Sequence, residues 1–205
     1  MPSALILIAD GTEEMEFTIT YDTLVRGGVR VVSAFVPDLS QQASATGGNT
    51  VIARCSRGMG IVPDTHFDLS HCGPDQYDLL VIPGGAKGAE TMAKHPSVQE
   101  LVRRYIERNK LVGMICAGSL AAKSAKLHRQ PLTSHPSVKS QLENDFDYLE
   151  DPVVVSDNLI TSRGPGEGSI CLRGKDAADI GQNGRYRISL CADPCRAALW
   201  RRAQG

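Results

Sequence analysis

Apolar runs alternate with segments of helical periodicity along most of the chain. The first run, residues 4–9, is apolar at every position, which is typical of a parallel strand buried on both faces. Further runs rich in apolar and β-branched residues occur at residues 29–36, 77–82, 111–115, 153–155 and 159–161. Segments of helical periodicity lie at residues 13–26, 88–94, 97–109, 120–127 and 137–145. This alternation predicts an α/β fold around a mainly parallel sheet.

Other stretches depart from the alternation. Residues 37–48 are polar and predict a surface loop, whereas residues 50–54 and 60–63 predict two short strands that pair. After Gly166, glycines interrupt every candidate helix. We therefore expect one α/β domain over residues 1–166 and an atypical, poorly ordered tail over residues 167–205.

Composition excludes several classes of protein. The net charge is −1 with acidic and basic residues scattered along 205 residues, so no basic face points to nucleic acid. No apolar run approaches the roughly 18–20 residues of a membrane span, and no basic leader precedes the first apolar run. The six cysteines have irregular spacing. This predicts neither a disulfide framework nor a metal site, and it suits a reducing cytoplasm.

The strongest candidate for chemistry is Cys116, where an apolar run ends abruptly before small residues and a helix. This pattern predicts a strand, a tight turn and a helix start, the geometry of a nucleophile elbow. The positive end of a helix favours thiolate over thiol. A buried structural cysteine at the end of a core strand is the alternative.

Three acidic residues follow the first predicted strand: Glu13, Glu14 and Glu16. Carboxyl ends of parallel strands share one sheet edge, so these side chains are expected near Cys116. A carboxyl kept protonated there can hydrogen-bond a thiolate and exchange its proton with a substrate oxygen. Acidic residues in a first helical turn also simply complement the helix dipole.

Two further elements are expected at the same edge. Gly84 and Gly85 follow the strand at 79–82, and their amides, with that of Ala117, could bind an oxyanion. Two glycines after a strand also form ordinary turns. His135 lies where the chain returns after the elbow helix, and it is either a proton shuttle or a surface histidine.

Five motifs occur in the order found in one known family. They are DGTEEME at residues 10–16, IPGG at 82–85, ICAG at 115–118, TSHP at 133–136 and TSRGPG at 161–166. From about residue 4 to 166, the chain resembles the PfpI-like superfamily, in the branch of Parkinson disease protein seven. The resemblance implies a flavodoxin-like three-layer sandwich, usually a homodimer.

The resemblance also assigns roles to residues. It implies a reactive Cys116 on the elbow, Glu16 as the general acid and base hydrogen-bonded to it, and His135 as the nearby proton shuttle. Gly85 and Ala117 would supply oxyanion-type amides.

Two further residues match positions with supporting roles in the family. Cys55 lies where relatives carry a second cysteine near the dimer interface. Arg26 matches a basic residue that supports the site near an oxidised thiol.

The family activities are cofactor-independent and need no metal. They include conversion of the α-oxoaldehyde methylglyoxal to lactate without glutathione, removal of early glycation adducts from proteins and nucleotides, and roles in oxidative and carbonyl stress in the cytoplasm and nucleus. One alternative is a redox-sensing chaperone in which Cys116 is oxidised and Glu16 stabilises the sulfinate. Another is a cysteine peptidase or amidotransferase, which requires a histidine with an acidic partner.

The chain departs from the family after residue 166. Relatives continue with a long apolar helix that packs on the sheet, but residues 167–174 are too polar and too glycine-rich for one. Each large side chain of such a helix would contribute about 1.5–3 kcal/mol when buried. We therefore expect this chain to be less stable than its full-length relatives.

Overall fold

The computed structural model describes residues 1–39, 51–165, 169–172 and 188–191. The strands of the main sheet are β1 (Ser3–Ile8), β2 (Arg30–Phe35), β5 (Thr65–His66), β6 (Leu79–Ile82), β7 (Leu111–Ile115), β10 (Val153–Ser156) and β11 (Leu159–Ser162). The helices are α1 (Glu14–Arg26), α2 (Ala86–Lys94), α3 (Pro96–Glu107), α4 (Leu120–Ser124) and α5 (Lys139–Leu142). Two short 3-10 helices are η2 (Cys116–Ser119) and η3 (Pro136–Val138).

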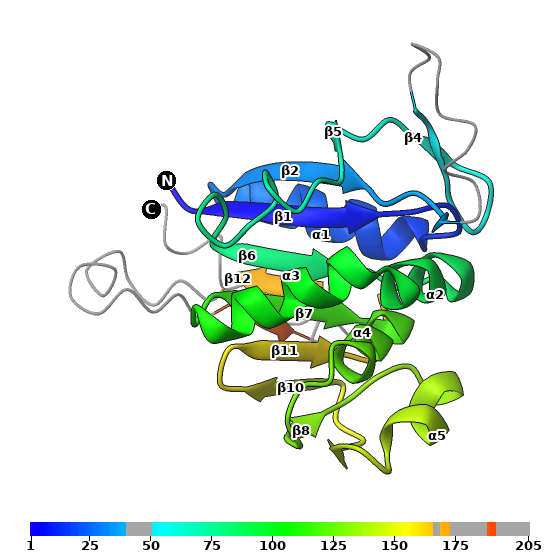
Figure 1. Cartoon of the computed structure of the whole chain (residues 1–205), viewed down its shortest axis with the longest axis vertical. Coiled ribbons are helices and arrows are strands. Elements are labelled where there is room, and N and C mark those ends of the chain that lie inside the picture. The colour runs from blue at the N-terminus through cyan, green and yellow to red at the C-terminus, as the bar shows by residue number, and fades with distance from the viewer. Residues whose placement is uncertain (40–50, 166–168, 173–187, 192–205) are drawn as a thin grey trace, which may run out of the picture.

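The sheet has the strand order β10-β11-β7-β6-β1-β2-β5 (Figure 1). Every neighbouring pair is parallel except β10 and β11, which form an antiparallel hairpin. The central order β2-β1-β6-β7-β11 is that of a flavodoxin-like sheet, with a switch point between β1 and β6. The expectation of a flavodoxin-like, mainly parallel fold is confirmed.

Strand β1 shows why this is a three-layer fold. Leu5 and Leu7 face one core, which they share with buried residues of α2, α3 and α4. Ala4, Ile6 and Ile8 face a second core with Phe17 and Leu24 of α1. Figure 1 shows α2, α3 and α4 in front of the sheet and α1 behind it. Burial on both faces explains why the strand is apolar at every position.

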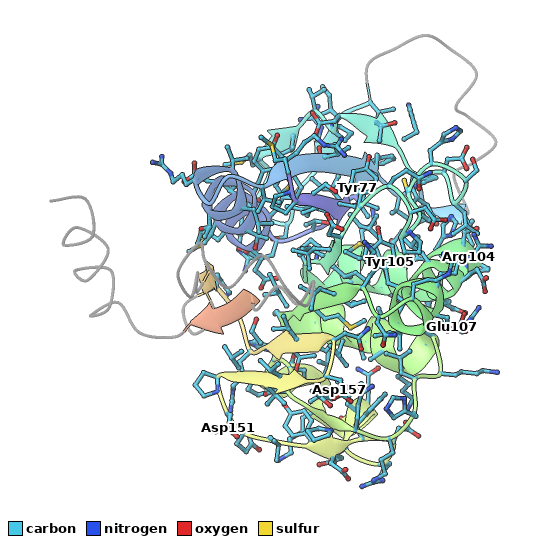
Figure 2. The ribbon with its side chains drawn as sticks, turned by 90° about the vertical axis from the view of Figure 1, so that its left-hand side faces the viewer. Tyr77, Arg104, Tyr105, Glu107, Asp151 and Asp157 are labelled. Atoms are coloured by element: carbon cyan, nitrogen blue, oxygen red, sulfur yellow. The ribbon has the colours of Figure 1, made fainter. Side chains whose placement is uncertain are left out.

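The front layer is anchored by Tyr105 of α3, labelled in Figure 2. This side chain is fully buried. Its hydroxyl donates to the carbonyl oxygens of Cys72 and Gly73, at 3.2 and 3.3 Å. The bond fixes the loop that leads into β6 against the helix layer.

Strand register brings three turns to one edge. Ile6 pairs with Val81, and Val81 with Gly113, so β1, β6 and β7 end at nearly the same level. The turns that follow these strands contain the candidate acidic residues, the two glycines and the cysteine elbow. Their predicted meeting at one edge is confirmed.

Smaller elements surround this sheet. The predicted antiparallel pair is present as β3 (Ala53–Arg54) and β4 (Gly60–Ile61). The pair β8 (Pro131–Leu132) and β9 (Asp147–Tyr148) is parallel and was not predicted from the sequence. Most of the expected loop at residues 37–48 lies outside the described residues.

Two predicted helices are shorter than expected. The segment after the elbow is not one helix over residues 120–127, because η2 comes first and α4 ends at Ser124. Lys126 then adopts a left-handed conformation with φ of +56°, which an α-helix cannot continue. The segment at 137–145 is divided between η3 and α5, and α5 ends at Leu142.

Beyond residue 166 the structure describes an antiparallel pair, β12 (Ser169–Leu172) and β13 (Ile188–Cys191). Strand β12 contacts α1, and β13 contacts β11. The remainder of the predicted poorly ordered tail lies outside the described residues. In the described part of the chain, no helix is long and apolar enough to cross a membrane.

Candidate active site

Cys116 is the first residue of η2 and forms a strained turn directly after β7. Its φ is +60°, a left-handed conformation that costs energy for a residue with a side chain. Gly118 makes this turn possible, because a Cβ there would lie 2.3 Å from the carbonyl oxygen of Ile82. The elbow therefore packs its backbone directly onto the end of β6, and the thiol is left half-buried.

Glu16 faces this thiol from the first turn of α1. It is 2 % exposed, and its carboxyl is hydrogen-bonded to Cys116. Oε2 accepts from the Gly84 amide at 2.6 Å, whereas Oε1 is buried and has no partner among the described residues. Burial raises the pKa of Glu16 to about 7.

Glycines let the three turns approach closely. A Cβ at Gly84 would lie 2.8 Å from Oε2 of Glu16 and 2.9 Å from Cβ of Cys116. The amide of Gly84 is already used by Glu16, so the expectation that it binds an oxyanion is wrong. The amides of Gly85 and Ala117 donate to Cys116 instead. They are the groups placed to stabilise an anion formed on or next to the sulfur.

The acidity of Cys116 differs from the sequence-based expectation. Burial and the adjacent Glu16 carboxylate raise the pKa of the thiol to about 12, although the Ala117 and Gly85 amides lower it. The helix start predicted to favour thiolate is only a 3-10 turn followed by five residues of α4. Thiolate therefore forms readily only when Glu16 is protonated, because the neutral carboxyl does not repel the sulfur charge and can donate a hydrogen bond to it.

Glu16 and Cys116 consequently titrate as a pair. As the pH rises above about 7 the pair comes to hold one negative charge, on either the carboxylate or the thiolate. One proton separates these two forms, and it crosses a single hydrogen bond. Such a pair can present a nucleophile together with a general acid, which becomes a general base after it gives up its proton.

His135 is near the elbow through its backbone. Its amide donates to the carbonyl oxygen of Cys116 at 3.3 Å, but the side chain is exposed. The ring Nδ1 lies 2.8 Å from Oγ of Ser137 and accepts from the Ser137 amide at 3.2 Å. The imidazole is thus at the rim of the site, and its hydrogen bonds among the described residues are with Ser137.

Arg26 does not join this site within the chain. It lies at the C-terminal end of α1, about 15 Å along the helix from Glu16 by helical rise. Its guanidinium is exposed and pairs with Asp22 at 2.6 Å. The structure therefore gives no support to the expectation that Arg26 assists Cys116 within one chain.

Cys55 lies in the turn of the β3–β4 hairpin and is buried. Burial and nearby acidic residues, Glu14 first, raise the pKa of its thiol to about 11. Cys72 is also buried, whereas Cys116 is half-exposed. Cys116 is therefore the most accessible of these three thiols.

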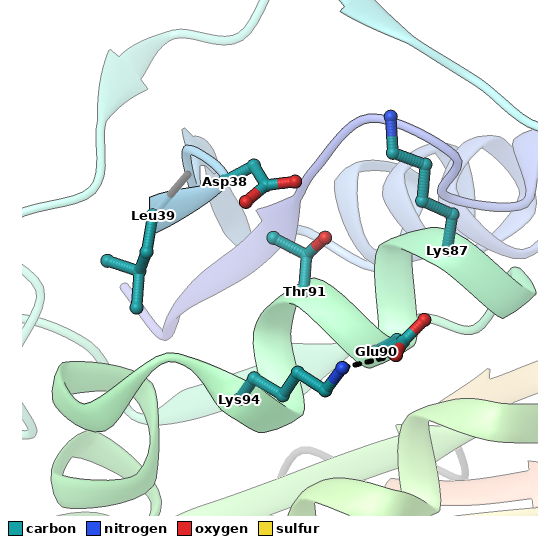
Figure 3. A pocket seen from close by; sticks show the side chains of 6 residues that line it. All are labelled: Asp38, Leu39, Lys87, Glu90, Thr91 and Lys94. Carbon is teal, nitrogen blue, oxygen red and sulfur yellow. Dashed lines mark hydrogen bonds and ion pairs between the residues drawn. The ribbon is translucent and has the colours of Figure 1, made fainter. Parts of the chain in front are cut away.

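A separate hollow of about 420 Å³ lies on the outer face of α2 (Figure 3). It is lined by Asp38, Leu39, Lys87, Glu90, Thr91 and Lys94. Glu90 and Lys94 form an ion pair across part of it. The lining contains neither Cys116 nor Glu16, so this hollow is distinct from the cysteine site.

The chain matches the model of the DJ-1/PfpI family over residues 2–170. The chain belongs to the DJ-1/PfpI family. It is 36% identical over 171 residues to a protein of Schizosaccharomyces pombe named glutathione-independent glyoxalase DJ-1, covering 81% of this chain and 85% of the relative. It is 41% identical over 166 residues to dj-1beta of Drosophila melanogaster, covering 80% and 82% of the two chains.

A solved DJ-1 structure agrees with this assignment. Schizosaccharomyces pombe DJ-1 superposes with a TM-score of 0.70 at 36% identity, covering 80% of this chain and 84% of that one. Membership of the DJ-1/PfpI family thus rests on a family model, on curated relatives and on the fold.

Sequence reasoning missed the buried hydroxyl groups beneath the elbow. Oγ of Ser119 donates to the carbonyl oxygen of Thr133 at 3.0 Å, and Oγ1 of Thr161 accepts from the Thr133 amide at 2.9 Å. These bonds hold the segment before His135 against η2 and β11. Hydroxyl residues carry no periodic signal, so only the folded chain shows that they meet.

Proposed function

We propose that this DJ-1/PfpI protein is a glutathione-independent glyoxalase that converts methylglyoxal and water to lactate. The observation that carries the proposal is the hydrogen-bonded Glu16–Cys116 pair, which lies beside the Gly85 and Ala117 amides. The name of the Schizosaccharomyces pombe relative supports the same activity. The chemistry proposed uses side chains, backbone amides and water.

The first step is addition of the Cys116 thiolate to the aldehyde carbon. A C–S bond forms, the carbonyl π electrons move to oxygen, and the Glu16 carboxyl protonates that oxygen to give a hemithioacetal. The Gly85 and Ala117 amides steady the developing negative charge. Glu16 is then a carboxylate and is ready to act as a base.

Proton transfer between the two carbons follows. The Glu16 carboxylate removes the hydrogen of the former aldehyde carbon, which the adjacent ketone acidifies, and an enediolate forms with its negative charge on the former ketone oxygen. Glu16 returns the proton to the neighbouring carbon, the hydroxyl proton of the first carbon passes to the second oxygen, and a lactoyl thioester on Cys116 results. Water hydrolyses the thioester, releasing lactate and regenerating the pair. His135 is proposed to carry protons between this pair and solvent from its position at the rim.

Lactate formation from methylglyoxal tests this proposal. Cys116→Ala should abolish turnover, because no covalent adduct can form, and Glu16→Ala should reduce it by at least about a hundredfold. Cys72→Ala is the matched control, since Cys72 is a buried thiol remote from the proposed chemistry, and it should retain turnover. Wild-type protein that binds methylglyoxal but forms no lactate would refute the proposal.

The site also favours a second function, in oxidant sensing. A sulfinate on Cys116 could accept hydrogen bonds from the Gly85 and Ala117 amides and from protonated Glu16. Mild peroxide should then oxidise Cys116 before Cys55 and Cys72, as measured by peptide mass spectrometry. Equal oxidation of the three cysteines would contradict this function. The peptidase alternative is not supported, because the His135 ring is bonded to Ser137 rather than to an acidic residue.

Several finer assignments belong to the proposal. Removal of early glycation adducts would use the same thiolate, and it is tested by release of lactate from a methylglyoxal-treated peptide. Residues 1–166 are proposed as the catalytic domain. A cytoplasmic and nuclear location is proposed because the free thiols of Cys55, Cys72 and Cys116 suit a reducing compartment, and cell fractionation tests it. Chaperone-like behaviour is tested by suppression of the aggregation of a client protein.

A homodimer is also proposed. Exposed apolar side chains occur at the start of α1 and on the hairpin bonded to it: Met15, Ile52, Met59 and Val62. The backbone of Met59 approaches the Glu14 carboxylate of α1, which connects the two elements. A second copy covering this apolar area would remove it from water. Light scattering should give a dimer mass for wild type and a monomer mass for Met15→Asp.

A further inference from the structure

A closed ring of hydrogen bonds joins Glu13, Glu16 and Gly84. The Glu13 carboxylate accepts from the Glu16 amide at 2.8 Å, and the Glu16 carboxyl accepts from the Gly84 amide at 2.6 Å. The Glu13 amide then donates to the Gly84 carbonyl oxygen at 3.1 Å. Each member therefore orients the next, and the ring ends at the carboxyl that contacts Cys116.

We propose that Glu13 is a positioning residue for the reaction, which holds the Glu16 carboxyl against Cys116 through this ring. The expected effect on turnover rests on the proposed function. The expected effect on the reactivity of the Cys116 thiol does not depend on that function. Glu13 does not touch Cys116 in the ring, so it acts through Glu16.

The local backbone explains why a side chain is needed at this position. Glu13 is the N-cap of α1, with an extended conformation at φ −76° and ψ 122°. Its side chain satisfies an amide that has no partner within the helix. Without that bond the first turn of α1 can fray, and Glu16 lies in that turn. The ring thus converts an ordinary helix cap into support for the carboxyl.

The charge of Glu13 adds a second effect. Burial is the main reason that the pKa of Glu16 is raised, and the Glu13 carboxylate raises it further. In the described part of the chain, the titratable groups that face Glu16 are Glu13 on its own turn and Cys116 on the elbow. Negative charge on Glu13 opposes negative charge on the Glu16–Cys116 pair. The pair therefore keeps its protons to higher pH.

Glu14 provides a matched control. It is adjacent in the sequence and buried, but its carboxylate accepts from Oγ of Ser56 at 2.8 Å and from the Arg57 amide. It therefore fastens the β3–β4 hairpin rather than the Glu16–Cys116 pair. The same substitution at Glu13 and Glu14 compares two acidic residues that have different partners.

The experiment measures alkylation of Cys116 by iodoacetamide against pH in the full chain, followed on the Cys116 peptide by mass spectrometry. Glu13→Gln keeps an acceptor for the Glu16 amide but removes the charge. Its alkylation midpoint should move to lower pH by about 0.5 unit, the order of effect of removing one nearby charge, because the Glu13 carboxylate no longer raises the pKa of Glu16. Glu14→Gln should leave the midpoint in place, although it can lower the melting temperature.

Turnover supplies the second arm. Glu13→Ala lacks the acceptor, and methylglyoxal turnover should fall about tenfold because Glu16 is no longer held in line. Glu13→Gln should restore it to within about threefold of wild type at the optimum pH. Alkylation midpoints that coincide in wild type, Glu13→Gln and Glu13→Ala would overturn the proposal, as would equal shifts in Glu13→Gln and Glu14→Gln. If wild type forms no lactate, the proposed function fails while the alkylation arm still decides the role of Glu13.

Discussion

Replacing Glu16 with glutamine should change how the stability of the protein depends on pH. The pKa of Glu16 is raised from 4.5 to about 7 in the folded chain, chiefly by burial. The folded state therefore holds this proton more tightly than the unfolded state does. Its stabilising contribution is fully present below about pH 4.5 and is lost as the pH rises through about 7.

The size of the effect follows from the two pKa values. Their difference corresponds to about 3 kcal/mol of unfolding free energy, lost by wild type between about pH 4.5 and 8. Glutamine does not titrate, and its side-chain oxygen can still accept from the Gly84 amide. The free energy of unfolding of Glu16→Gln, minus that of wild type, should therefore rise by about 3 kcal/mol over this interval.

Urea denaturation followed by circular dichroism, at several pH values from 4.5 to 8, measures this difference. Glu107→Gln is the control, because Glu107 is exposed at the end of α3 (Figure 2). Its difference from wild type should stay nearly constant with pH. A constant difference for Glu16→Gln as well would show that the carboxyl does not retain its proton in the folded chain.

Three further outcomes are expected. Gly118→Ala should lower the free energy of unfolding, measured by urea denaturation, by at least about 2 kcal/mol, because the new methyl group meets the backbone at the end of β6. It should also slow Cys116 alkylation. Gly113→Ala should lower the free energy of unfolding less, because the nearest neighbours there are 3.9 Å away. Tyr105→Phe should lower the unfolding free energy by about 1–2 kcal/mol, since two buried loop carbonyls lose their donor. The chain should melt below full-length DJ-1 relatives in calorimetry, and an equal or higher melting temperature would refute the expected cost of its altered tail.

The sheet was predictable because its signal is local. Residues 4–9 are apolar at every position, and a turn and a segment of helical periodicity follow them. Parallel order then places the turns at one edge without further information. The short 3-10 turn after Cys116 was not predictable, because its length depends on how the elbow packs against β6 rather than on apolar periodicity.

The three acidic residues after β1 show where sequence reasoning stops. Glu13, Glu14 and Glu16 were equal candidates by composition and spacing. The structure gives each a different partner. Glu13 binds an amide at the start of α1, Glu14 binds the β3–β4 hairpin, and Glu16 binds the Gly84 amide and Cys116. Gly84 lies 68 residues from Glu16 and Cys116 lies further still, so these positions depend on the tertiary fold. The pKa of the thiol was misjudged for the same reason.

The bond between Gly84 and Glu16 spans 68 residues, and Cys116 lies still further along the chain. During synthesis, Glu16 therefore emerges long before either partner exists. The pair can form only after β1, β6 and β7 have associated, a late event because distant segments must first meet. Until then Cys116 behaves as an ordinary thiol in an open chain, and the growing polypeptide carries no reactive centre. The protein gains its chemistry only when it completes its fold.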